Sequence, residues 1–174
     1  MTCGNYCSRK DYADLTAPDL QTRGAAAEKF AKVVLAHELD LTACNYTRES
    51  RGRGIDIAMR NPSQKLVVVE VKSSITDKPF SQLLKPAYNI PHRGGVQRQG
   101  SVGWLEGVRE NALGEGKPAD RIVRECLEEP ERVPVIGVHI DPVHKMAHIF
   151  VRSDENAFEW KEIMDPIPLH LYVR

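Results

Sequence analysis

The chain has 174 residues, and its 24 lysines and arginines are balanced by 24 aspartates and glutamates, so its formal net charge is zero. Its hydrophobic content of 41% is enough to build a core, whereas a disordered chain combines low hydrophobicity with a large net charge. Apolar runs such as Leu66 to Val69 are far shorter than the roughly 20 residues of a membrane-spanning helix. We therefore expect a globular protein with no membrane span. The neutral balance excludes a uniformly basic nucleic-acid binder, but it leaves room for a local basic groove.

The polar residues 1–21 have no clear period, and they are predicted to form a flexible leader ahead of a single domain over residues 22–174. Cys3 and Cys7 lie close together without a second pair downstream, so we interpret them as thiols of this leader rather than as half of a zinc site. The domain begins with a predicted helix over residues 22–39, in which Thr22 is the expected N-cap.

The rest of the chain alternates between strand and helix patterns. In chain order we predict strands at 43–49, 55–59 and 65–72, a loop with one helical turn at 77–103, helices at 104–113 and 119–127, strands at 133–140 and 146–151, a short helix at 157–164 and an edge strand at 169–173. This order predicts an α/β domain built around one mixed central sheet with flanking helices.

Two carboxylates and a lysine lie near the ends of neighbouring predicted strands. Glu70 and Lys72 are two residues apart on one strand, so their side chains share a face. Asp56 comes from the preceding strand, and neighbouring strands lie about 4.8 Å apart, which lets Asp56 stand beside Glu70. Two carboxylates at that distance repel each other unless a cation lies between them. The pattern predicts a divalent-metal site, with Mg²⁺ as the first choice and Mn²⁺ or Zn²⁺ as alternatives.

The chemistry that suits such a site is phosphodiester hydrolysis. A divalent ion polarises a phosphoryl oxygen and lowers the pKa of a bound water. Lys72 would orient that water or offset the charge that develops on the phosphorus. Taken alone, a Glu-x-Lys pair on a strand is usually a solvated salt bridge, and it is the combination with Asp56 that favours a catalytic site.

The same residues resemble the PD-(D/E)xK nuclease superfamily over about residues 22–75. Asp56 matches the superfamily's aspartate, and Glu70-Val71-Lys72 matches its Glu-x-Lys element. Glu28 matches an acid found on the upstream helix of many members, although a glutamate at the rim of an apolar helix face is often only solvated. The resemblance implies a restriction-endonuclease-like core in which Asp56, Glu70, the carbonyl of Val71 and Glu28 hold the metal. It also implies catalytic roles for Asp56, Glu70, Lys72 and Glu28.

Two departures bear on this resemblance. Ile55, not proline, precedes Asp56, which is common in the superfamily. Gln82 and Tyr88 are six residues apart and do not reproduce the Gln-x3-Tyr helix of the exonuclease branch, so the branch stays open.

A second resemblance concerns the segment from Val96 to Glu106. Its Gln…Ser…Trp pattern is similar to restriction-endonuclease-like toxin domains at the C-terminal tips of contact-dependent inhibition and polymorphic toxins. This resemblance implies an effector that is delivered into the cytoplasm of a target cell, that cleaves DNA or, as a close second, tRNA, and that a cognate immunity protein neutralises. The alternatives are a cytoplasmic housekeeping nuclease of repair or junction resolution, and a catalytically silent nucleic-acid-binding or protein-interaction domain.

Nucleic-acid contacts are predicted from the local charge pattern, because four basic residues and no acid lie between Lys78 and Leu105. The candidate contacts are Arg51, Arg53, Arg93, Gln97, Arg98, Gln99 and Trp104. Gln97 and Gln99 fit an ordinary polar loop as well, and Trp104 fits a core anchor at the start of a helix as well as a base-stacking ring. The histidines near the predicted hairpin, His139, His144 and His148, lack metal-ligand spacing and are interpreted as surface or pairing residues.

Overall fold

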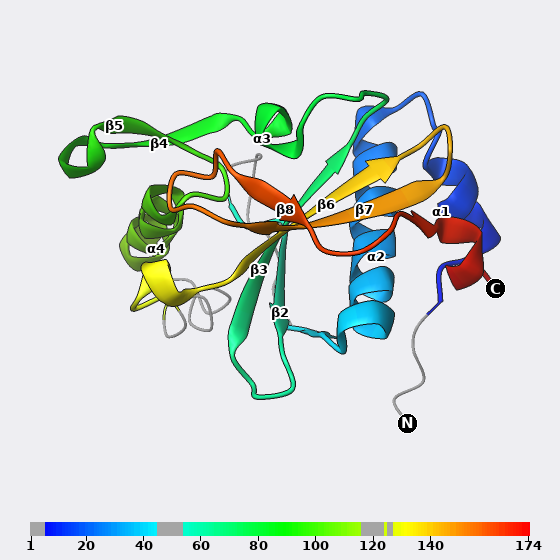
Figure 1. The fold of residues 1–174 in the computed structure, drawn as a ribbon, viewed down its shortest axis with the longest axis horizontal. Helices are drawn as coiled ribbons and strands as arrows, with labels where there is room; N and C mark the ends of the chain where they lie inside the picture. Colours follow the sequence, from blue (N-terminus) through cyan, green and yellow to red (C-terminus); the bar gives the residue numbers. More distant parts are fainter. Residues whose placement is uncertain (1–5, 45–53, 116–123, 125–126) are drawn as a thin grey trace.

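The computed structural model describes residues 6–44, 54–115, 124 and 127–174, with side chains left undescribed at 111–115. Within these ranges the protein is a mixed α/β fold built on a seven-stranded sheet (Figure 1). The sheet order is β1-β2-β3-β6-β7-β8, and β9 pairs with β7. The predicted fold class is confirmed at this level: a mixed central sheet with helices packed against it.

The bounds of the elements are as follows. The helices are α1 (Arg9–Asp14), α2 (Leu20–Leu39), α3 (Phe80–Leu83) and α4 (Val102–Glu115), with 3-10 turns η1 (Pro91–Arg93), η2 (Pro130–Arg132) and η3 (Leu169–Tyr172). The strands are β1 (Thr42–Ala43), β2 (Ile57–Arg60), β3 (Leu66–Ser73), β4 (Pro86–Ile90), β5 (Gly95–Arg98), β6 (Val135–Asp141), β7 (Met146–Arg152), β8 (Trp160–Glu162) and β9 (Ile167–Pro168).

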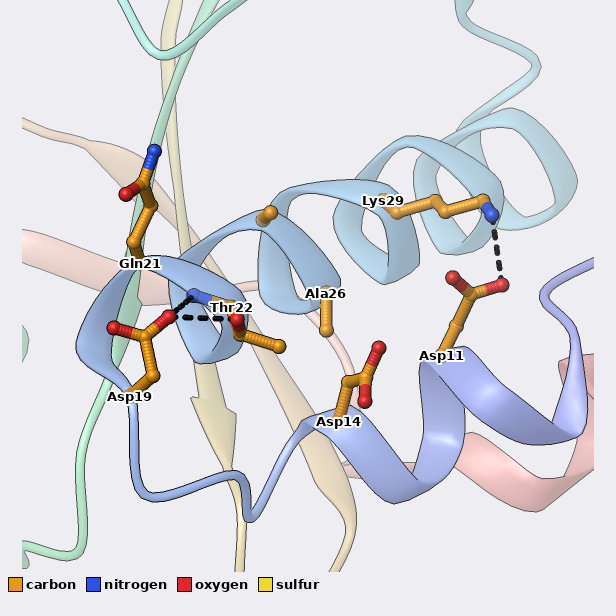
Figure 2. Close-up of a pocket in the computed structure, with 8 residues that line it drawn as sticks. Asp11, Asp14, Asp19, Gln21, Thr22, Ala26 and Lys29 are labelled. Atoms are coloured by element: carbon orange, nitrogen blue, oxygen red, sulfur yellow. Dashed lines mark hydrogen bonds and ion pairs between the residues drawn. The ribbon is translucent and has the colours of Figure 1, made fainter.

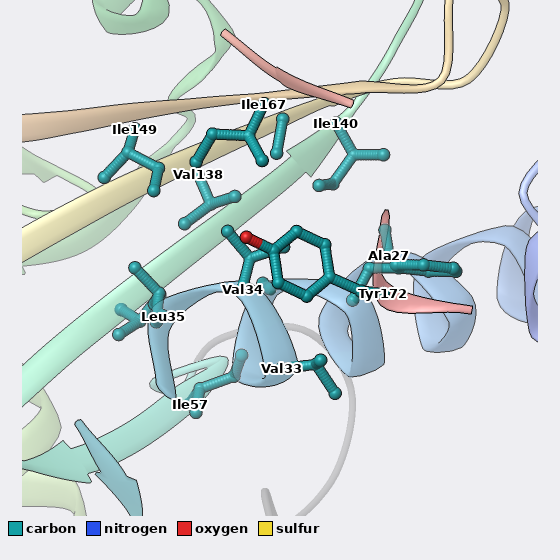
Figure 3. Close-up of a cluster of buried hydrophobic side chains, with 14 of the residues drawn as sticks. Ala27, Val33, Val34, Leu35, Ile57, Val138, Ile140, Ile149, Ile167 and Tyr172 are labelled. Carbon is teal, nitrogen blue, oxygen red and sulfur yellow. The ribbon is translucent and has the colours of Figure 1, made fainter. Parts of the chain in front are cut away.

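Helix α2 covers one face of the sheet and forms the larger core with it (Figure 3). Its N-cap is Asp19, whose carboxylate accepts a hydrogen bond from the backbone N–H of Thr22 at 2.7 Å, so the N-cap lies three residues before the predicted Thr22. The buried side chains of Phe30 and Leu35 pack in one cluster with Val69 of β3. Burial of such side chains is the main stabilising contribution to this layer.

Helix α4 covers the opposite face. Alternate residues of β3 point to opposite faces, so Leu66 and Val68 pack with Trp104 and Leu105 of α4, away from α2. The β4–β5 hairpin lies against α4 in turn (Figure 1). It approaches closely at Gly107, where a Cβ would lie 2.5 Å from the ring of Tyr88. Both faces of β3 are therefore buried over most of its length, as its β-branched run predicts.

Strands β3 and β6 are the parallel pair on which the sheet depends. Val69 lies opposite Ile136, and Glu70 lies opposite Gly137 in the parallel register. A parallel pair needs a long crossover, and the chain between Ser73 and Val135 provides it through α3, the β4–β5 hairpin and α4. The remaining neighbours, β2 with β3 and β6 with β7, are antiparallel.

Part of the predicted leader is ordered, and the prediction was wrong there. Ser8 and Asp11 form a reciprocal capping box at the start of α1. Cys7 and Leu15 are fully buried in the α2 core, and Cys7 pairs with Val173 near the other end of the chain. The polar sequence concealed this because only a few of its residues are apolar, although Cys7, Leu15 and the partly buried Tyr6 and Tyr12 pack in the core.

Three other predicted elements differ from the structure. The segment 77–103 contains α3 and the β4–β5 hairpin rather than a loop with one helical turn. The segment 157–164 contains strand β8 instead of a helix, because residues 160–162 pair with strand β7. The segment 169–173 contains the 3-10 turn η3 instead of the predicted edge strand. Most of the predicted strand 43–49 lies outside the described residues, and only its first residue belongs to β1. The predicted helix 119–127 also lies mostly outside the described residues.

The first prediction compares two leucines of α2. Leu35 is fully buried and Leu20 is 75% exposed. We expect Leu35→Ala to lower the free energy of unfolding by about 2–5 kcal/mol, because it removes buried apolar contacts and leaves a cavity. Leu20→Ala should lower it by less than about 0.5 kcal/mol, since an exposed side chain loses little on truncation. Urea unfolding measures both, and an equal loss in the two variants would contradict the packing described here.

Candidate active site

Glu70 and Lys72 lie at the C-terminal end of β3, on the face that carries Val68. Glu70 is completely buried, and the neighbouring position on β6 is Gly137, where a Cβ would overlap the ring of Phe80. Phe80 thus lies directly against the sheet next to Glu70. Lys72 Nζ lies 3.9 Å from Glu70 Oε2 and its side chain is 18% exposed. A buried carboxylate therefore faces a partly accessible ammonium.

Asp56 precedes β2 and is held against the same end of β3. Its Oδ2 accepts a hydrogen bond from the backbone N–H of Val71 at 2.9 Å. The β2–β3 register ends with Ile57 opposite Val69, and Asp56 is the residue immediately before β2. The structure therefore brings Asp56, Glu70 and Lys72 to one end of the β2–β3 pair, as the sequence predicts.

Oxygen ligands at this end of β3 would suit a hard divalent cation, but the described residues include no group of three metal-ligating side chains. The carboxylates of Asp56 and Glu70 and the Val71 carbonyl are the oxygen ligands that the sequence predicts, and Mg²⁺ uses one or two carboxylates while keeping several waters. Among the described residues, no three acidic, histidine or cysteine side chains lie close enough together to hold a metal ion. Glu28, half-buried on α2, therefore does not complete a three-acid group with Asp56 and Glu70.

Gln99 contacts the site through Lys72. Its Oε1 accepts a hydrogen bond from Lys72 Nζ at 2.8 Å, although the two residues are 27 positions apart. The sequence marks Gln99 only as a candidate nucleic-acid contact. The periodicity of the segment does not reveal that the end of the β4–β5 hairpin reaches back to β3.

Two other predicted contacts have structural roles. Gln97 is buried and donates its amide N–H groups to the carbonyls of Arg93 and Gly95, at 3.2 and 2.8 Å. Trp104 is fully buried in the α4 core, which is the anchor role rather than the base-stacking one. A buried ring cannot stack on a substrate base, so we leave Trp104 out of the proposed contact surface.

Two of the predicted arginine contacts, Arg93 and Arg98, form hydrogen bonds within the chain. Arg93 Nε donates to the carboxylate of the buried Glu106 at 2.5 Å, and this hydrogen bond lowers the pKa of Glu106. Arg98 Nη1 donates to the carbonyl of Ser81 at 2.7 Å, and its guanidinium lies 4.2 Å from the centre of the Phe158 ring. The predicted contacts Arg51 and Arg53 lie outside the described residues.

A row of polar side chains continues across the sheet from Lys72. His139 is its register partner on β6, and His148 of β7 lies opposite His139 with the two rings 5.8 Å apart. His139 Nε2 is 2.9 Å from the carbonyl oxygen of Ser74, and His148 Nδ1 is 3.0 Å from Glu162 Oε1. Burial lowers the pKa of His139 below its usual value. Of the surface or pairing roles expected for the three histidines, His139 and His148 pair across neighbouring strands, and His139 is buried.

A hollow lies between α1 and α2, away from these residues, and it is lined by three aspartates (Figure 2). Each of these aspartates has an ion-pair or hydrogen-bond partner within the chain. Asp11 contacts Lys29 at 2.7 Å, Asp14 contacts Lys10 at 2.5 Å, and Asp19 caps α2. Burial opposes ionisation of Asp11, but hydrogen bonds from Lys29 and Ser8 lower its pKa to about 2. The hollow is explained by helix capping and ion pairing.

Comparison of the chain with protein-family models, curated proteins and solved structures finds no match in any of the three. Among the described residues, no helix is both long and apolar enough to cross a membrane.

The second prediction concerns pH. The pKa of His139 is lowered in the folded state, so the unfolded chain takes up a proton first. The stability tied to neutral His139 is fully present above about pH 6.5 and is lost as the pH falls from that value towards the lowered folded pKa. We expect His139→Gln to reduce the loss of stability between about pH 7.5 and about pH 5.5, measured by urea unfolding.

The matched control for this prediction is His170→Gln, which changes an exposed histidine of η3. It should keep the wild-type decrease in stability. If His139→Gln kept that decrease unchanged as well, burial of a neutral His139 would not account for it.

Proposed function

We propose that this protein is a metal-dependent nuclease of the PD-(D/E)xK type, acting on DNA as the first choice and on tRNA as the second. The observation that carries the proposal is the convergence of Asp56, Glu70 and Lys72 at the end of β3. A fully buried glutamate is costly to ionise in a core, so its presence beside a second carboxylate and an ammonium favours a functional role over a structural one.

The cofactor in this proposal is a divalent cation, with Mg²⁺ first and Mn²⁺ or Zn²⁺ as alternatives. Asp56, Glu70 and the Val71 carbonyl would hold it. When bound, such an ion polarises a phosphoryl oxygen and lowers the pKa of a coordinated water. A role for Glu28 stays a prediction, because α2 packs on the opposite face of the sheet from Glu70.

The chain's own groups account for the rest of the chemistry. Lys72 is 18% exposed, so its ammonium can meet a phosphate from solvent while it stays tied to Gln99. There it would offset the charge that develops on the phosphate or orient the attacking water. Burial of Glu70 strengthens its electrostatic interactions with the Lys72 ammonium and with a bound cation, since the local dielectric constant is low.

The fold gives independent support at a coarse level. The order α2, β1, β2, β3, α4, β6 places a helix on each face of a mixed sheet, with the site where β2 and β3 end. This is compatible with the restriction-endonuclease-like core that the sequence resemblance implies. Phosphate contacts by Arg51, Arg53, Arg93 and Arg98 would make substrate binding weaken as the salt concentration rises.

The biological setting in this proposal comes from the resemblance of the segment Val96–Glu106 to toxin domains. On that basis the protein acts as a delivered antibacterial toxin in the cytoplasm of a target cell. Its partner is a cognate immunity protein that blocks cleavage.

The third prediction is that the site residues are required for cleavage. Plasmid DNA and total tRNA are each incubated with the purified chain, with Mg²⁺ or with EDTA. We expect Asp56→Asn, Glu70→Gln and Lys72→Ala each to reduce the cleavage rate roughly 100-fold or more, because each removes a charge from the reacting centre. EDTA should abolish cleavage by the unmodified chain.

The matched controls are Lys65→Ala and Glu129→Gln. Lys65 precedes the other end of β3, and Glu129 is exposed beside η2, so neither touches the site. Both variants should cleave at the unmodified rate. Full activity of the Asp56, Glu70 and Lys72 variants would overturn the site, and an inactive unmodified chain that still binds nucleic acid would favour the silent-domain alternative.

The fourth prediction separates a toxin from a housekeeping nuclease. We expect expression of the unmodified chain in a bacterium to arrest growth, because unrestrained nucleic-acid cleavage is lethal, and Glu70→Gln to relieve the arrest. The arrest should also be relieved by the product of a small neighbouring gene. Normal growth with an active, soluble enzyme would favour the housekeeping alternative.

A further inference from the structure

The amide of Gln99 is fixed from several directions. Its Oε1 accepts hydrogen bonds from Lys72 Nζ at 2.8 Å and from the backbone N–H of Lys85 at 3.1 Å. The backbone N–H of Gln99 donates to the carbonyl of Lys85 at 2.9 Å. Gln99 is only 7% exposed. The amide oxygen therefore occupies a defined position at the end of the β4–β5 hairpin.

The turn that follows Gln99 is equally constrained. Gly100 has a positive φ of 82°, and a Cβ there would lie 3.0 Å from the ring of Trp160. Its carbonyl accepts a hydrogen bond from Arg152 Nη1 at 2.7 Å. The hydroxyl of Ser101 accepts one from the backbone N–H of Trp104 at the start of α4. The two residues after Gln99 are thus attached to β7, β8 and α4, and these contacts fix the backbone that carries Gln99.

This attachment bears on the distance between Lys72 and Glu70. The ammonium is 2.8 Å from Gln99 but 3.9 Å from the nearest oxygen of Glu70, which is the limit of an ion pair. A direct hydrogen bond between ammonium and carboxylate is about 2.7–2.9 Å long. Lysine has a flexible stem, and in a buried setting a closer approach to the carboxylate would be electrostatically favoured. A closer ammonium would compete with a metal ion for Glu70.

We propose that Gln99 is a positioning residue that holds the Lys72 ammonium short of direct contact with Glu70, so that Glu70 can take a divalent cation. The inference deepens the proposed function and rests on its metal site. It assigns Gln99 a role towards the lysine and not towards the nucleic acid. Removal of the amide should therefore weaken metal binding only while Lys72 is present.

The test is a double-mutant cycle on Mn²⁺ binding, with the free ion measured by electron paramagnetic resonance and no substrate present. The variants are Gln99→Met, Lys72→Met and the double variant. We expect Gln99→Met to weaken Mn²⁺ binding roughly tenfold, the usual size of an outer-shell effect. The double variant should bind Mn²⁺ as tightly as Lys72→Met alone, because no ammonium remains to be restrained.

Gln97→Met is the matched control. Gln97 is also a buried glutamine of the same hairpin, but it donates to the carbonyls of Arg93 and Gly95 and does not contact Lys72. It should leave Mn²⁺ affinity unchanged. If Gln99 only supports the hairpin, the double variant will bind Mn²⁺ as weakly as Gln99→Met, and this result overturns the inference while leaving the metal site standing. Failure of the unmodified chain to bind Mn²⁺ overturns the metal site itself.

A kinetic readout gives a second, independent measurement. Cleavage by Gln99→Met should recover when Mg²⁺ is raised by about the factor lost in affinity, whereas cleavage by Lys72→Met should not recover. Should Gln99→Met fail to fold, Gln99→Asn replaces it, since it keeps a buried amide but withdraws the oxygen by one methylene. Cleavage by the Gln99 variant that stays low at saturating Mg²⁺ would contradict the inference.

Discussion

A fully buried carboxylate on the central strand is the feature on which the rest of the site depends. Glu70 follows a run of β-branched residues whose two faces are covered by α2 and α4, and its side chain is completely enclosed. An ionised carboxylate in such a place is destabilising unless nearby groups offset its charge. Lys72 on the same face offsets part of that charge, whereas Asp56, held by the backbone N–H of Val71, brings a second negative charge to the same end of β3.

The two ends of β3 differ in polarity: one end packs in the cores, and the other carries the candidate site residues. Towards Leu66 the strand is apolar on both faces and belongs to the cores, whereas from Glu70 onwards its α4-side face turns polar. The ring of Phe80 lies against Gly137 between these regions. The core fixes the strand register, and the register in turn brings the start of β2, which follows Asp56, beside the strand position before Glu70. Precise placement of the polar groups is therefore a consequence of apolar packing.

The sequence predicts those parts of the structure that depend on local pattern. The β-branched run into Glu70 and the alanine-rich helix before it correspond closely to β3 and α2. It fails where pairing with a distant strand overrides local preference, as at Trp160, which joins β7 although its neighbours favour a helix. Trp104 was ambiguous for a related reason, because burial depends on what packs against a residue and not on the residue itself. The link from Gln99 to Lys72 spans 27 positions and has no local signature.

The parallel pairing of β3 and β6 explains why that link exists. Parallel neighbours cannot be joined by a short turn, so the chain must leave β3 beside the site and return over one face of the sheet. The crossover uses this path to bring the end of the β4–β5 hairpin over Lys72 before α4 begins. The segment that completes the fold is therefore also the segment that reaches the reactive end of β3. A substitution in this crossover can alter the chemistry of the site without touching either carboxylate.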